Sequence, residues 1–73
     1  MSALTDQLLS VSKPFLGPAT ESFLQRQCAH IKVEMTALTS ANLKDLAIWV
    51  NRSGALIMDA QKADVLAKKI AAL

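Results

Sequence analysis

Residues 38–58 of this chain have the sequence LTSANLKDLAIWVNRSGALIM, which holds the longest helical pattern in the chain. The start of a helix is marked by Thr39, a suitable N-cap, and by Leu38 and Leu43, which can touch as a hydrophobic staple around that cap. Apolar or small residues then recur at helical spacing, as one face of a helix requires: Leu43, Leu46, Ala47, Val50, Gly54, Ile57 and Met58. The stretch therefore predicts a long amphipathic helix ending at Met58.

Gly54 is a poor helix former, but it stands at a position that the apolar repeat places on the buried face of the helix. A glycine costs up to about 1 kcal/mol relative to alanine inside a helix, so Gly54 marks either a break or a close crossing with another helix. We favour the crossing, because the apolar repeat continues on both sides of the glycine.

Asp59 has the character of an N-cap and predicts a last helix from Ala60 to about Ala72. No Gly or Pro stands at this joint, so one longer kinked helix remains an alternative. The expected buried stripe of the last helix contains small and branched apolar residues: Ala63, Leu66, Ala67, Ile70 and Leu73.

Two further helices are expected upstream. The first runs from about Ala3 to Lys13, with Ser2 as a plausible N-cap, and ends at Pro14 because proline disfavours helical geometry in the residue before it. Its apolar stripe is Leu4, Leu8 and Val11, and Phe15 and Leu16 then fall in a connector.

The second helix starts with Pro18 at its first position, where the missing N–H costs nothing. It ends near His30 or Ile31 and buries Phe23, Leu24, Cys28 and Ile31.

Residues 31–35, Ile-Lys-Val-Glu-Met, alternate apolar and polar and could form a short strand by period alone. The chain offers no second strand for pairing, and an isolated strand is not stable. We interpret the segment as a connector that places Val33 and Met35 in the core. The expected fold is all-α: a single domain over residues 1–73, a small bundle of three to four amphipathic helices with short connectors.

The composition is apolar for so short a chain. Apolar residues make up 52% of its 73 residues, mean hydropathy is +0.30, and 19% of residues are charged, against about 25% in an average soluble domain. Alanine-rich and leucine-rich helices explain part of this excess. The alternative is that some apolar surface is kept for a partner.

The sequence offers no support for catalysis or for a metal. Cys28 is the single cysteine, so no disulfide can form within the chain, and Cys28 and His30 are too few for a structural zinc site. We interpret Cys28 as a small core residue and His30 as a residue near a helix end. The acidic residues are dispersed and no phosphate-binding loop is present. We expect a protein that is not an enzyme and that holds no cofactor and no metal.

A second apolar strip on the helix of residues 39–58 predicts a binding surface. It lies off the core face and includes tryptophan, the residue most enriched in interface hot spots: Ile48, Trp49, Arg52, Ala55 and Leu56. Neighbouring helices could bury this strip instead. We favour a partner surface, for a second copy in a homodimer or for another protein; a subunit that folds only with a different protein is a further possibility.

Nucleic-acid binding is the alternative function. The second predicted helix carries the best polar cluster for it, namely Gln25, Arg26, Gln27 and His30. The formal net charge is only +2, whereas a nucleic-acid-binding surface needs a dense basic stripe, so we do not expect this binding.

No apolar run is long enough to span a membrane and no signal-peptide pattern is present. With one unpaired cysteine, these features favour a cytoplasmic protein.

Overall fold

The computed structural model describes residues 3–73, and all the regular structure in that range is helical. Four α-helices follow one another: α1 (Ala3–Leu16), α2 (Thr20–His30), α3 (Leu43–Ile57) and α4 (Ala60–Ala71). Short 3-10 turns precede α2 and α3, at Gly17–Ala19 and Ser40–Asn42, and a third lies in the connector, at Met35–Ala37. The all-α prediction is confirmed. The expected cap at Ser2 lies outside the described residues.

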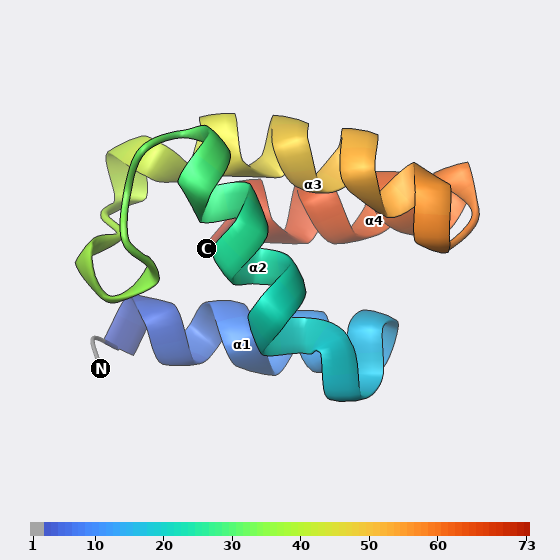
Figure 1. The fold of residues 1–73 in the computed structure, drawn as a ribbon, viewed down its shortest axis with the longest axis horizontal. Coiled ribbons are helices and arrows are strands. Elements are labelled where there is room, and N and C mark those ends of the chain that lie inside the picture. Colours follow the sequence, from blue (N-terminus) through green and yellow to red (C-terminus); the bar gives the residue numbers. More distant parts are fainter. Residues whose placement is uncertain (1–2) are drawn as a thin grey trace.

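In the ribbon, α3 and α4 run side by side along one edge of the molecule, α1 lies along the opposite edge, and α2 crosses between them (Figure 1). The pair α3 and α4 is antiparallel, since Asn51 of α3 bonds Asp64 of α4 and Gly54 lies against Ala63. Of the three connections between the four helices, those after α1 and α3 are short, as predicted, whereas the one after α2 is longer and carries residues of the core.

The end of α1 differs from the prediction. The helix continues through Pro14 to Leu16 and stops at Gly17, whose φ of +58° is the left-handed geometry that commonly ends a helix. Phe15 and Leu16 are half-buried and pack against the core. Their burial offsets the hydrogen bond that is lost at Pro14, which has no backbone N–H to donate.

The buried face of α1 is also shifted from the predicted stripe. Thr5, Leu8 and Ser12 are fully buried, while Leu4 and Val11 are only partly buried at its margins. The Thr5 hydroxyl donates a hydrogen bond of 2.7 Å to the carbonyl of Met35. This bond ties α1 to the connector, so a small polar side chain takes the place that the pattern assigned to a leucine.

The second helix and the connector follow the sequence closely. Pro18 lies in the 3-10 turn before α2, which ends at His30 as expected. Beyond it, Lys32 adopts a φ of +59° and turns the chain. Val33 is half-buried and Met35 is buried, so residues 31–35 form a connector that enters the core.

Both predicted N-caps downstream are present. At Thr39 the backbone N–H and the hydroxyl both donate to Oδ1 of Asn42, at 2.9 and 3.1 Å. At Asp59 the carboxylate accepts the N–H of Lys62 at 2.7 Å. The second cap separates α3 from α4, because the chain is extended at Met58 and Asp59. The single kinked helix is therefore excluded.

Gly54 marks a helix crossing, as predicted. The α3 helix runs unbroken through it, and a Cβ placed on Gly54 would lie 3.2 Å from Cβ of Ala63. That separation is tighter than ordinary side-chain contact, so the glycine sets how closely α3 approaches α4.

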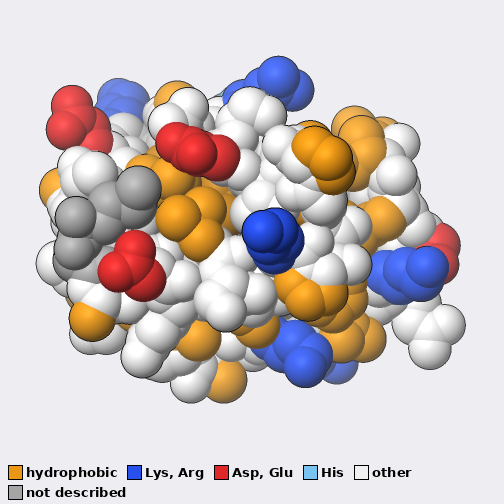
Figure 2. Space-filling view, turned by 90° about the horizontal axis from the view of Figure 1, so that it is seen from below, with side chains coloured by type: hydrophobic (Ala, Val, Ile, Leu, Met, Phe, Trp, Pro, Cys, Tyr) orange, Lys and Arg blue, Asp and Glu red, His pale blue; other side chains and the backbone are white. Residues whose placement is uncertain are grey.

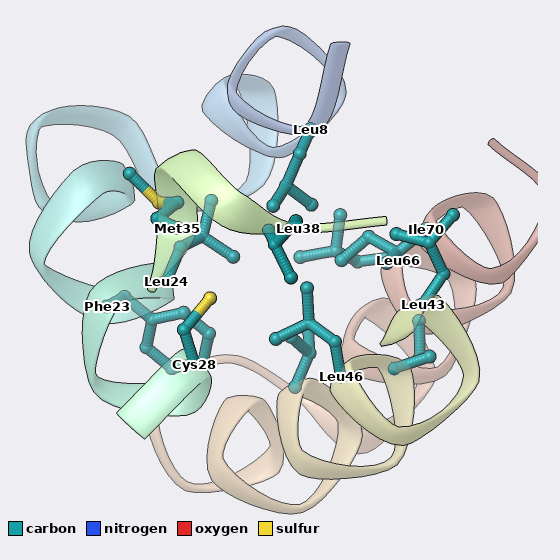
Figure 3. Close-up of a cluster of buried hydrophobic side chains, with 13 residues drawn as sticks. Leu8, Phe23, Leu24, Cys28, Met35, Leu38, Leu43, Leu46, Leu66 and Ile70 are labelled. Carbon is teal, nitrogen blue, oxygen red and sulfur yellow. The ribbon is translucent and has the colours of Figure 1, made fainter. Parts of the chain in front are cut away.

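Every helix and the connector contribute to one core (Figure 3). In the close-up, Leu8 points inward from α1 toward Leu38 of the connector, and α2, α3 and α4 enclose the remaining sides. Two residues predicted for the core do not enter it: Ile57 is 62% exposed at the last position of α3, and Leu73 is exposed beyond the end of α4.

Candidate interaction surface

Among residues 3–73, no other element packs over the outer face of α3. Because Leu46, Val50 and Gly54 turn toward the core, the opposite side of this helix faces away from the molecule. That side carries four of the five residues of the second predicted strip, all of them exposed: Ile48, Arg52, Ala55 and Leu56. We call these four residues the outer α3 surface.

The two large apolar side chains of the outer α3 surface are well exposed. Ile48 is 51% exposed and Leu56 is 86% exposed. The alternative that neighbouring helices bury this strip on every side is therefore wrong for these two residues.

Trp49, the fifth residue of the strip, is held in place by contacts within the chain. It is half-buried, and its ring stacks on the imidazole of His30 with 4.2 Å between ring centroids and 9° between the planes. The guanidinium of Arg52 lies 5.6 Å from the Trp49 ring centroid, close enough for a cation–π contact. Trp49 thus forms a fixed margin of the outer α3 surface on the side of α2.

Ile57 extends the exposed apolar area beyond the predicted residues. It lies with Leu56 in a groove of about 330 Å³ between α2 and α3, which Phe23 and Arg26 also line. The sequence pattern placed Ile57 in the core because it keeps the helical phase. Its position as the last residue of α3 was the available signal, because a helix face loses its neighbours where the chain leaves the helix.

A shallower groove borders the other side of the outer α3 surface. It lies between α3 and α4, has a volume of about 300 Å³, and includes Ile48 in its lining. On α4, Lys68 and Asp64, one helical turn apart, form an ion pair of 2.9 Å along its rim. Ile48 is consequently flanked by charged groups, whereas Leu56 is flanked by Ile57.

The four residues of the nucleic-acid hypothesis do not form one exposed surface. Gln25, Arg26 and His30 are exposed, but Gln27 is buried and its Oε1 accepts a hydrogen bond of 2.8 Å from the Ser53 hydroxyl. His30 is engaged with Trp49. Gln27 is therefore not available to a nucleic acid, and a hydroxyl on α3 satisfies its amide oxygen inside the fold.

Cys28 is a core residue, as expected. Burial raises the pKa of its thiol above the ordinary value of 9.0, so the neutral thiol predominates at neutral pH and the thiolate needed of a nucleophile is scarce. Cys28 also borders a cavity of about 480 Å³ between α2 and the connector. Among residues 3–73, no three His, Cys, Asp or Glu side chains gather as a metal site would require.

The side of the molecule away from α3 has a mixed surface. Figure 2, seen from below relative to Figure 1, shows hydrophobic side chains in several separate places with charged and polar ones between them. Within residues 3–73, no helix has the length and apolar character to cross a bilayer.

Comparisons with known proteins add no further constraint: no protein-family model, no curated protein and no solved structure matches the chain.

Proposed function

We propose that this chain is a non-enzymatic interaction module that self-associates, as a homodimer, through the outer α3 surface. The observation that carries the proposal is the 86% exposure of Leu56, next to Ile57 and on the same helix as the exposed Ile48. Clustered exposed apolar side chains on a small domain mark interaction sites more often than scattered ones do.

The size of the chain supports the same proposal. A domain of 73 residues buries only about 60% of the surface exposed by its unfolded chain, which leaves a thin margin of stability. Association through an apolar face adds burial that the monomer lacks. A symmetric dimer is the commonest form of such association. If the chain proves monomeric, the surface would instead be expected to bind another protein.

The test is molar mass in solution, measured by size-exclusion chromatography with light scattering over a wide range of concentrations. We expect the mass to rise toward that of a dimer. Leu56→Asp should weaken association by about tenfold or more, because burying a leucine side chain contributes about 1.5–3 kcal/mol. Leu56 suits this test because its exposure means that the substitution leaves the core intact.

Val65→Asp is the matched control. Val65 is also an exposed branched apolar residue, but it belongs to α4 and lies outside the outer α3 surface. Its substitution should leave the dimer unchanged. A monomer at every concentration would contradict the proposal, and equal effects of the two substitutions would contradict the assignment to α3.

A further inference from the structure

Two opposite charges accompany the apolar residues on the outer side of α3. Asp45 lies in the first turn of α3 and Arg52 near its middle, and both side chains are exposed. Together with Ile48 and Ala55 they follow spacings of three, four and three, which place all four on one line along the helix. Asp45 and Arg52 are seven residues apart, two helical turns or about 10.5 Å along the axis.

The positions of these two charges select one orientation for a second copy. They lie at equal distances from the midpoint between Ile48 and Trp49. If two α3 helices pack antiparallel about that midpoint, each Asp45 faces Arg52 of the second copy, so two opposite-charge pairs form. Parallel packing in register would instead place like charges opposite each other, which destabilises an interface.

We infer that the homodimer is a two-fold, antiparallel pairing of α3 helices centred between Ile48 and Trp49, with Asp45 of each copy paired with Arg52 of the other. This inference rests on the proposed function. A two-fold axis requires each contact to occur twice. Asp45 and Arg52 lie at equal distances on either side of the midpoint, so the same ion pair can form twice.

The same register accommodates the exposed apolar side chains. Leu56 falls opposite Ala41 of the second copy, since each lies the same number of residues from the midpoint. Ala41 is exposed in the 3-10 turn that leads into α3, and its single methyl group leaves room for a leucine. Ile48 of each copy lies beside the midpoint, so the centre of the contact is apolar, the two charge pairs flank it, and Leu56 with Ala41 lies at each end.

The length of α3 limits the strength of the dimer. Its 15 residues extend about 22 Å at 1.5 Å per residue, and one helix face of this length buries less than the roughly 800 Å² per partner of a standard interface. We therefore expect a dimer that dissociates on dilution through the micromolar range, about 10⁻⁶ M. The measurement must extend well above that concentration.

Charge reversal tests the pairing. The dissociation constant is measured by light scattering for wild type, Asp45→Arg, Arg52→Asp and the double variant. Each single reversal places like charges together at both pairs, so we expect about a tenfold or greater weakening. The double variant restores opposite charges at both pairs and should regain most of the wild-type affinity. In a parallel dimer the double variant would keep its like-charge contacts.

Two controls separate pairing from local effects. Asp6→Arg reverses another exposed aspartate in the first turn of a helix, on α1, and should leave the dimer unchanged. Arg52→Gln removes the contact of Arg52 with Trp49 without adding an acid, so it should weaken the dimer less than Arg52→Asp does. Far-UV circular dichroism establishes that each variant is folded.

The outcomes distinguish this inference from the proposed function. Recovery of affinity in the double variant, after loss in both single variants, supports the antiparallel pairing. A dimer that Leu56→Asp weakens but that is insensitive to the charge reversals, or that the double variant fails to restore, overturns the pairing while self-association stands. A wild-type chain that is monomeric at every concentration overturns both.

Discussion

Ser12 has a fully buried hydroxyl that lacks a hydrogen-bond partner among the described residues. A buried polar group without a partner keeps the cost of its desolvation, about 1–3 kcal/mol. Alanine removes the hydroxyl and suits a helix better than serine. We therefore expect Ser12→Ala to raise the free energy of unfolding by about 1 kcal/mol, measured by urea denaturation.

Ser10→Ala is the control for that prediction. Ser10 belongs to the same helix but is exposed, so its substitution isolates the gain in helix propensity. A Ser12→Ala protein no more stable than the Ser10→Ala protein would show that the buried hydroxyl imposes no penalty.

Residue-level predictions from the sequence succeeded where the residue type and the helical phase agreed, as for Leu24 and Cys28. They failed for Gln27, which is polar in a run of polar residues yet buried. Its partner, Ser53, is 26 residues away, and a single sequence contains no local signal of such a pairing.

At the scale of the element, the cap at Asp59 ends the connection between α3 and α4 and begins the last helix. Its carboxylate satisfies the N–H of Lys62 and adds a negative charge at the positive end of the helix. Asp59→Ala should therefore lower the free energy of unfolding by about 1 kcal/mol, measured by urea denaturation.

Asp59→Asn tests the cause of that loss, because asparagine keeps the accepting oxygen and removes the charge. It should retain most of the stability of wild type. If Asp59→Asn is as unstable as Asp59→Ala, the charge rather than the hydrogen bond is the main contribution.

The boundaries of the elements were predictable where a cap marks them, at Thr39 and Asp59, and at the end of α2. They were not predictable at Pro14, because the local preference against a helix there competes with the packing of Phe15 and Leu16. The exposure of Ile57 was missed for a similar reason. The apolar repeat shows which face of a helix is buried, but it does not show where along the helix other elements stop covering that face.

At the scale of the whole molecule, all four helices and the connector share one core. Removing any one helix would expose the others, so we expect unfolding to be cooperative. Far-UV circular dichroism, which follows all the helices, and the fluorescence of Trp49, which follows the contact of α2 with α3, should give coincident urea transitions. An α3–α4 pair that persists after the fluorescence change would contradict this expectation.

The class of fold was predictable because it depends on periodicity and on the few glycines and prolines. The relative placement of the helices was not, because it depends on which faces meet. The second strip on α3 could be identified as apolar from the sequence, but its exposure became evident only when α1, α2 and α4 were seen to occupy the other sides of the core.

The close approach of Gly54 to Ala63 has a consequence for how this sequence can vary. The 3.2 Å between an added Cβ and the methyl group of Ala63 leaves room for about one methyl group at the crossing. In related sequences that keep this fold, the side chains at positions 54 and 63 must together fit into that volume. Alanine at 54 would favour glycine at 63, and the two positions should change together through evolution rather than independently.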